Sequence, residues 1–242
     1  MASVLPLVPR VNGLLSLISD DERACFLESS EPVSLSFNEI LVEPGDVLQQ
    51  VYFPADSFIS IITSIDGRPS LEVGLIGNEG MLGASLLLGV DSSPTHALVQ
   101  GAGTALCMDA EIFRRQIKDY PALHRALLRY IHVTIQQLAQ TAACTRFHVV
   151  EARLARWLLM TQDRACANTS DVTQEFLAYM LGVRRVGITA AASDLQRRKL
   201  ISYSRGHMEI LDRVGLEAAS CSCYAADWES YNRTMQYPDA EQ

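Results

Sequence analysis

Two adjacent arginines, Arg184 and Arg185, have the residue type and the position needed to read DNA bases. An arginine guanidinium donates two parallel hydrogen bonds, which match the O6 and N7 acceptors of guanine in the major groove. Thr189, about one helical turn further along, belongs to the same candidate DNA-binding set. The sequence shows no paired-carboxylate, nucleophile–base or metal-ligand spacing, so we expect no catalytic residues, no metal and no cofactor, and an enzyme is the least favoured class.

The segment Asp171–Ile201 is predicted to fold as two short helices that hold the arginine pair at the start of the second helix. Asp171 or Thr173 can cap the first helix through a side-chain oxygen, and Gly182 ends it where the backbone needs a positive φ. Apolar residues at helical spacing give each helix one buried face: Phe176, Leu177, Met180 and Leu181, then Ile188, Ala191, Ala192 and Leu195. The pattern is typical of a helix-turn-helix, whose second helix enters the major groove; the alternative is an αα-hairpin that only packs.

A β-hairpin is predicted directly after the second helix, over Ile201–Leu211, with its turn near Gly206. A hairpin in this place is the wing of a winged helix. It would present Arg205 and His207 at its tip, close to the backbone of a bound duplex.

Positive charge concentrates in this part of an otherwise acidic chain. The 242 residues carry a formal net charge of −8. Residues 146–214 hold 11 basic and 7 acidic side chains, whereas residues 1–145 hold 8 and 16, and residues 215–242 hold 1 and 5. An acidic body should confine DNA to the one positive face.

The first half of the chain predicts an antiparallel β-barrel or sandwich. Residues 1–31 suggest a short helical lead with Asp20 as a cap. Residues 32–110 contain short apolar runs cut by turn signals such as Pro44-Gly45-Asp46 and Asp66-Gly67. Residues 80–88 break this pattern and suggest one helical turn inside the barrel.

A long helix is predicted over residues 111–148, with a break before Pro121. Apolar or small residues on it alternate steps of three and four, which is the spacing of a helix–helix seam: Leu128, Ile131, Ile135, Leu138, Ala142, Thr145 and Val149. We favour a dimer seam over packing on the chain's own barrel, because most other positions are polar or small. Two-fold symmetry would suit recognition of two DNA half-sites.

This order of parts resembles the Crp/Fnr family of bacterial transcription regulators over residues of about 30 to 223. The likeness is strongest at Glu151–Trp157 (EARLARW) and over Thr173–Arg185, which reads T-Q-E-F-L-A-Y-M-L-G-V-R-R. It implies that Arg185 reads bases, that Arg184 takes a neighbouring position, and that Thr173 and Gln174 contact phosphates. Val186 departs from the family, because the member that reads G·C pairs has Glu there, and Gly187 is unusual inside a helix. Gly187 could allow close approach to DNA, or it could be drift, which we favour.

The sensor half departs further from the family's cyclic-nucleotide-binding members. Those carry a Glu for the ribose and an Arg for the cyclic phosphate. The matching segments here are Gly83-Ala84-Ser85 and Thr95-His96-Ala97, which hold neither group. We therefore expect a degenerate pocket around Gly83, Ser85, Thr95 and His96 that does not bind cyclic AMP, and His96 is more readily explained as structural.

The six cysteines are scattered and form no C-x-x-C pair. Cys25 alone precedes the barrel, which is too few for the iron–sulfur cluster of other family members. Cys221 and Cys223 lie on a predicted final helix, Asp212–Cys223, where one intervening residue would point the thiols apart. With no export signal or membrane segment in the sequence, we expect inert reduced thiols in a cytoplasmic protein.

The sequence thus predicts an α+β protein: an antiparallel jelly-roll barrel (residues 1–119), a dimerisation helix (120–148), a winged helix-turn-helix (149–223) and a tail (224–242), disordered from about Arg233. Its predicted function is that of a homodimeric, sequence-specific DNA-binding transcription regulator. Its expected partners are a palindromic duplex and a second copy of itself, with RNA polymerase as a candidate and an unknown effector. The alternative is a small-molecule or redox sensor of the same fold whose DNA-binding element is inactive.

Overall fold

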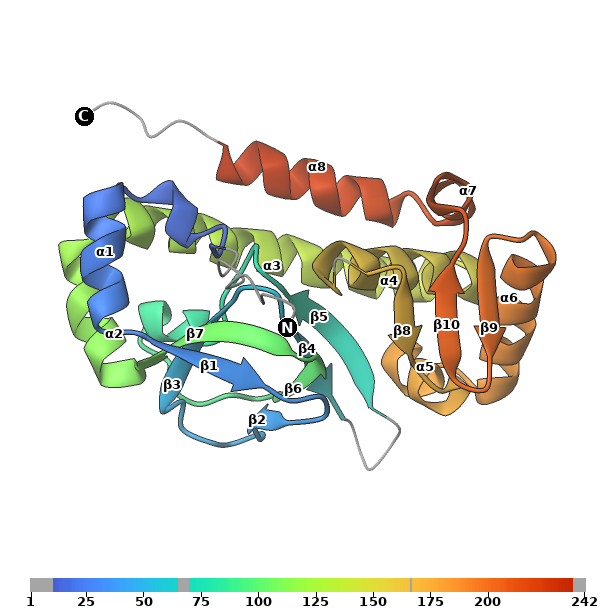
Figure 1. Cartoon of the computed structure of the whole chain (residues 1–242), viewed down its shortest axis with the longest axis horizontal. Helices are drawn as coiled ribbons and strands as arrows, with labels where there is room; N and C mark the ends of the chain where they lie inside the picture. Colours follow the sequence, from blue (N-terminus) through green and yellow to red (C-terminus); the bar gives the residue numbers. More distant parts are fainter. Residues whose placement is uncertain (1–10, 65–69, 166, 237–242) are drawn as a thin grey trace, which may run out of the picture.

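The computed structural model describes residues 11–64, 70–165 and 167–236 (Figure 1). A β-sheet region comes first, a long helix runs along the molecule, and a smaller region of helices and three strands follows. The α+β architecture predicted from the sequence is confirmed. Among the described helices, none combines the length and the apolar character that crossing a membrane would require.

A short helical lead precedes the sheets, as the sequence predicts. It consists of the 3₁₀ turn η1 (Leu15–Leu17) and helix α1 (Asp20–Glu28). The predicted cap at Asp20 is wrong by one residue: the Ser19 side chain accepts from the backbone N–H of Glu22, and the Glu22 carboxylate reaches back to the N–H of Ser19. This reciprocal pair satisfies two backbone donors at the helix start.

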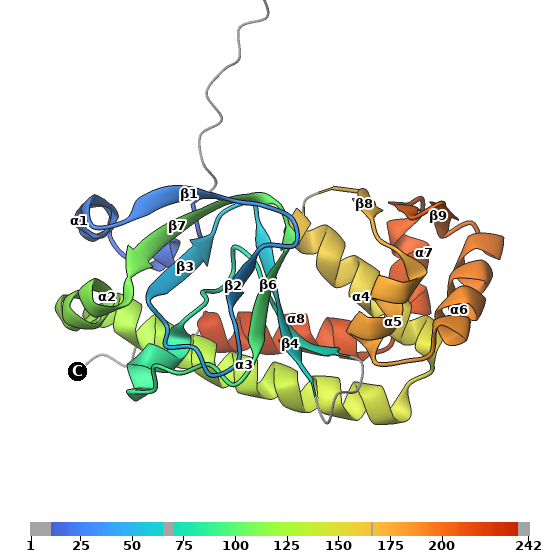
Figure 2. The same ribbon diagram turned by 90° about the horizontal axis from the view of Figure 1, so that it is seen from below.

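Two antiparallel sheets face each other across the main hydrophobic core (Figure 2). One has the strand order β1-β7-β3 and the other β2-β6-β4-β5. The strands are β1 (Glu31–Leu35), β2 (Ile40–Val42), β3 (Gln50–Pro54), β4 (Phe58–Thr63), β5 (Leu71–Ile76), β6 (His96–Gly101) and β7 (Gly103–Asp109). Phe26, Phe53 and Phe113 are fully buried in this core, and the predicted helical turn is the 3₁₀ segment η2 (Ala84–Leu88).

The long helix α3 (Pro121–Phe147) links the sheets to the C-terminal region, after the short α2 (Ala110–Gln116) and η3 (Ile117–Asp119). Pro121 stands at its first turn, where a missing N–H costs nothing. At 1.5 Å per residue, α3 is about 40 Å long. Leu123, Ala126 and Leu127 on one of its faces are buried in the core of the sheet region.

The C-terminal region has its own hydrophobic core around Leu154, Leu158, Ile188 and Leu195. It comprises α4 (Val150–Ala165), β8 (Thr169–Asp171), α5 (Gln174–Leu181), α6 (Arg185–Arg197), β9 (Ile201–Ser204), β10 (His207–Ile210), α7 (Arg213–Ala219) and α8 (Cys223–Met235). Strands β8, β10 and β9 form one antiparallel sheet.

Helix α8 corrects two predictions about the end of the chain. The expected single helix Asp212–Cys223 breaks at Ser220, whose backbone is extended (φ −71°, ψ 162°). The expected tail is instead a helix up to Met235 that lies alongside α3 (Figure 1). Its partly apolar face explains this, because Met235 and Tyr231 pack against the main core. The predicted disorder from Arg233 is therefore wrong as far as Met235, and residues 237–242 lie outside the described residues.

Candidate nucleic-acid interface

The helix-turn-helix forms where the sequence places it, as α5 and α6. Thr173, not Asp171, caps α5, because its hydroxyl accepts from the N–H of Phe176 at 3.1 Å. Gly182 ends α5 with φ +61°, and a Cβ there would lie 2.9 Å from the Leu71 side chain. The turn therefore needs glycine both for its left-handed backbone and for its close approach to strand β5.

The start of α6 presents the arginine pair to solvent. Arg184 is the N-cap and Arg185 the first residue of the helix. Both are exposed, and Val186 beside them is 78% exposed. Ile188, Ala191, Ala192 and Leu195 are buried as predicted, so the opposite face of α6 is available to a groove.

Gln174 and Thr189 meet across the two helices. The Thr189 hydroxyl donates to the Gln174 side-chain oxygen at 2.6 Å. This bond fixes the first turn of α5 against the first turn of α6. Both predicted DNA-binding residues therefore lie next to the arginine pair.

The wing is a tight hairpin with Arg205 at its tip. Ser204 pairs with His207, which leaves Arg205 and Gly206 as a two-residue loop, and both have positive φ (+53° and +86°). That combination is the type I′ turn that the twist of a hairpin favours. Arg205 is exposed at this tip.

Sequence reasoning missed the third strand of the wing. Strand β8 pairs with β10, and Asp171 lies 2.9 Å from the His207 Nδ1. Thr169-Ser170-Asp171 has no alternation of apolar and polar residues that would reveal a strand. His207 is thus engaged by a carboxylate rather than standing alone at the tip.

The predicted sensor-pocket residues have structural contacts of their own. His96, on β6, places its Nδ1 2.9 Å from the Glu43 carboxylate. Gly83 is buried where a Cβ would come within 2.8 Å of the Val51 side chain. The Ser93 hydroxyl donates to the Thr95 carbonyl at 2.8 Å, and Ser85 is half-buried. These contacts give His96, Gly83 and Thr95 structural roles that need no ligand.

The helix-turn-helix region is tied to the sheet region by buried polar contacts. The Trp157 indole on α4 donates to Glu72 on β5 at 2.9 Å, and the Ser60 hydroxyl donates to the same carboxyl at 2.7 Å. Burial raises the pKa of Glu72 to about 7, against the opposing effect of these two bonds. Arg164 on α4 pairs with Glu79 at 2.6 Å.

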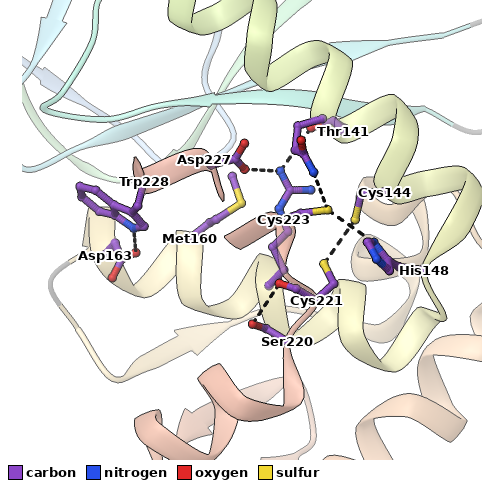
Figure 3. A network of polar contacts seen from close by, with 12 residues as sticks. Thr141, Cys144, His148, Met160, Asp163, Ser220, Cys221, Cys223, Asp227 and Trp228 are labelled. Atoms are coloured by element: carbon purple, nitrogen blue, oxygen red, sulfur yellow. Dashed lines mark hydrogen bonds and ion pairs between the residues drawn. The ribbon is translucent and has the colours of Figure 1, made fainter. Parts of the chain in front are cut away.

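Three cysteines and a histidine come together at the other end of α4 (Figure 3). Cys144, His148, Cys221 and Cys223 place their ligand atoms within 4.8 Å of one another. The expectation that Cys221 and Cys223 point apart on one helix is wrong, because the break at Ser220 puts them at the α7–α8 junction. The sequence offered one weak signal, the C-S-C run itself.

Comparison with known proteins agrees with this architecture. Residues 152–219 match the Crp-like helix-turn-helix domain. A CRP-like cAMP-activated global transcriptional regulator of Mycobacterium tuberculosis is 23% identical over 194 residues, which cover 77% of this chain and 86% of that protein. The global nitrogen regulator of a Nostoc species is 25% identical over 188 residues, covering 74% and 84%.

Solved structures show the same fold at low sequence identity. FixK2 from Bradyrhizobium japonicum has a TM-score of 0.66 at 12% identity and covers 79% of this chain and 98% of its own. The c-di-GMP-responsive global regulator CLP of Xanthomonas campestris has a TM-score of 0.65 at 18% identity, covering 79% and 99%.

Fold, helix-turn-helix and wing together define a DNA-binding regulator of the winged-helix class. The chain contains a Crp-like helix-turn-helix domain over residues 152–219 and shares its fold with solved regulators of the Crp/Fnr family.

Proposed function

We propose that this regulator binds a palindromic DNA site as a homodimer and reads it with the N-terminal end of α6. The observation that carries the proposal is the exposed pair Arg184–Arg185 at the start of a helix whose opposite face is buried. Such a pair has the donors and the position for guanine recognition in the major groove. A reading element that had lost its function would have no need of two solvated guanidiniums there.

In this proposal each residue of the site has a distinct role. Arg185 donates to guanine O6 and N7, and Arg184 contacts a neighbouring base or phosphate. Thr173 and Gln174 contact phosphates from the start of α5, and Thr189 holds Gln174 in place through their hydrogen bond. Arg205 and His207 contact the backbone from the wing, and His207 would exchange Asp171 for a phosphate.

The face of α3 that carries the predicted seam supports a dimer. Leu128, Ile135 and Leu138 are 41%, 59% and 47% exposed in the single chain. Helix α8 contacts the opposite face, through Gln136 and Gln140. Self-packing therefore does not explain the stripe, and a second copy of α3 is the occupant that its spacing favours. Exposed apolar residues in such a row are typical of an interface.

We further propose that the sheet region does not bind cyclic AMP. No carboxylate or guanidinium stands at the Gly83–Ser85 and Thr95–Ala97 positions, and His96 is held by Glu43. A calorimetric titration should show no binding at micromolar cyclic AMP. Binding at that level would contradict this part of the proposal and leave the DNA-binding part intact.

The domain organisation follows from the same proposal: a sensor-like region up to residue 119, the dimerisation helix over 120–148 and the DNA-binding region over 149–223, with α8 returning along α3. We place the protein in the cytoplasm, where its DNA partner is found, and keep RNA polymerase as a candidate partner and the effector as unknown.

A competition assay tests the DNA-binding proposal. Labelled palindromic duplexes, taken from promoter DNA of the source organism, compete with random DNA of equal length at moderate salt. We expect a clear preference for one palindrome, since specific binding exceeds non-specific binding by about 10³ or more. Equal competition by every duplex would contradict the proposal.

A further inference from the structure

The cluster of Cys144, His148, Cys221 and Cys223 has the donor set and the dimensions of a zinc site. Cys144 Sγ lies 3.6 Å from Cys221 Sγ, and Cys223 Sγ lies 3.4 Å from His148 Nδ1. Around a tetrahedral zinc with typical bond lengths, two sulfurs are about 3.8 Å apart and a sulfur and a nitrogen about 3.6 Å apart. These two donor pairs therefore have nearly the spacing of one coordination tetrahedron, and all four donor atoms lie within 4.8 Å of one another.

The surroundings exclude water from the thiols and place hydrogen-bond donors against them. Cys144, Cys221 and Cys223 are all buried. The Gln140 amide donates to Cys223 Sγ at 2.9 Å, and the backbone N–H of Cys223 donates to Cys221. Hydrogen bonds of this kind to ligand atoms orient a metal site and tune it.

Charge balance near the cluster points the same way. Three thiolates and one Zn²⁺ carry a net charge of −1. Arg153 is buried beside them and donates to the Leu181 carbonyl, and within the described residues it has no carboxylate partner. Arg156, by contrast, pairs with Asp227 at 2.6 Å. A buried cation needs a compensating charge, and an anionic zinc–thiolate centre supplies one for Arg153.

We infer that Cys144, His148, Cys221 and Cys223 bind one Zn²⁺ ion. Soft thiolates with one imidazole select zinc over magnesium or calcium. The donor atoms are too close together to enclose the several atoms of an iron–sulfur cluster, since they all lie within 4.8 Å of one another. With four protein ligands the site is closed, which is the arrangement of a structural rather than a catalytic zinc.

The ion would join two parts of the chain, the end of α3 and the α7–α8 junction, next to the start of α4. Cys144 is in the last turn of α3, His148 is the residue where α3 ends, and the other two ligands belong to the α7–α8 junction. Zinc would therefore fix the angle between the dimerisation helix and the DNA-binding region. This role is independent of which DNA sequence α6 recognises.

Metal analysis of the purified chain tests the inference. The protein is produced with zinc in the medium and purified under reducing conditions, and we expect one zinc per chain by mass spectrometry. Cys221→Ser should lose most of it, whereas the matched control Cys107→Ser, which changes a buried cysteine of β7 outside the cluster, should keep it. A wild type without zinc, or equal zinc in both variants, would overturn the inference, as would iron with inorganic sulfide.

Cobalt binding to the unmutated chain keeps the test independent of how well variants fold. Protein stripped by a chelator is titrated with Co²⁺ alone. Intense visible bands of tetrahedral cobalt with thiolate-to-cobalt charge transfer are expected, and Gln140→Ala should weaken binding by about 10-fold or more. A weak octahedral spectrum, or a Cys144–Cys221 disulfide as the stable form of freshly purified protein, would overturn it.

Discussion

At the scale of single residues, base recognition depends on which side chains the start of α6 presents to the DNA. Arg184 and Arg185 offer donors, but Val186 beside them offers none and is 78% exposed. A glutamate in that place can accept from cytosine N4, whereas a valine can contact only the methyl group of thymine. We therefore expect the operator to keep its guanine opposite Arg185 and to differ from the family's G·C pattern at the next step.

Arg205→Asn tests the positioning role of the wing. Asn tolerates the positive φ of this residue and forms the same turn with Gly206, so the change removes charge without removing the hairpin. We expect all duplexes to bind more weakly by a similar factor, with the salt-dependence slope reduced by about 1. Fluorescence anisotropy across a salt series measures both quantities. Loss of affinity for one sequence alone would show that Arg205 reads bases.

Gly187→Ala tests whether the glycine in α6 serves DNA binding. A Cβ at this position would meet only Val150, at 3.8 Å, so alanine fits without strain. We expect the free energy of unfolding to rise by about 1 kcal/mol, because glycine is a poor helix former. DNA affinity should stay unchanged. A stabilised variant with much weaker DNA binding would show instead that the backbone at Gly187 approaches the duplex.

At the scale of elements, each face of α3 has a different neighbour. One face lies on the main core, α8 contacts a second, and the stripe of Leu128, Ile131, Ile135, Leu138 and Ala142 is left over. The heptad-like spacing of that stripe predicted a partner helix, and the exposure of its apolar members supports this. We therefore propose a second copy of the chain as the partner of this stripe.

Ile135→Glu tests the seam, with Ala143→Glu as the matched control. Ala143 is also an exposed residue of α3, but it lies outside the stripe. A charge buried in the seam without a partner should weaken dimerisation by about 100-fold or more, while the control should remain dimeric. Sedimentation velocity over a concentration series gives the result. If both variants keep the assembly of the wild type, the seam is elsewhere.

The sequence predicted the elements whose signals are local. Gly182 and Gly206 mark turns with positive φ, and the apolar periodicity of α3, α5 and α6 survives in the folded chain. Strand β8 and helix α8 were not predicted from the sequence, because long-range neighbours stabilise them. Ser170 pairs with Met208, and Asp227 pairs with Arg156. The thiol cluster was not predicted for the same reason, since Cys144 and Cys221 are 77 residues apart in the sequence.

At the scale of the whole molecule, α4 joins the DNA-binding region to the sheet region through the buried carboxyl of Glu72. Trp157 and Ser60 donate to it from the two sides, and Arg164 adds an ion pair with Glu79 nearby. Trp157 in the middle of α4 and Arg164 near its C-terminal end thus tie the DNA-binding region to the sheet region, and the thiol cluster lies at the other end of the helix. A signal could act by changing either set.

The raised pKa of Glu72, about 7 in the folded protein, predicts a pH-dependent stability. Between its unfolded pKa of about 4.3 and the folded value, the native state binds more protons, so stability falls as pH rises through this range. The loss should be at most about 1.4 kcal/mol per pH unit. Urea unfolding of Glu72→Gln should show less of this dependence, and the exposed control Glu209→Gln should keep it. A wild type that gains stability across the same range would contradict the account.

The most direct test of the central claim is selection of bound duplexes from a random library, with the wild type beside Arg185→Ala. We expect the wild type to select a palindrome with half-sites one or more helical turns apart. We also expect Arg185→Ala to lose preference at the guanine position, at a cost of about 1–3 kcal/mol. Selection of the same palindrome with equal stringency by both proteins, or of no sequence by either, would contradict base reading by Arg185.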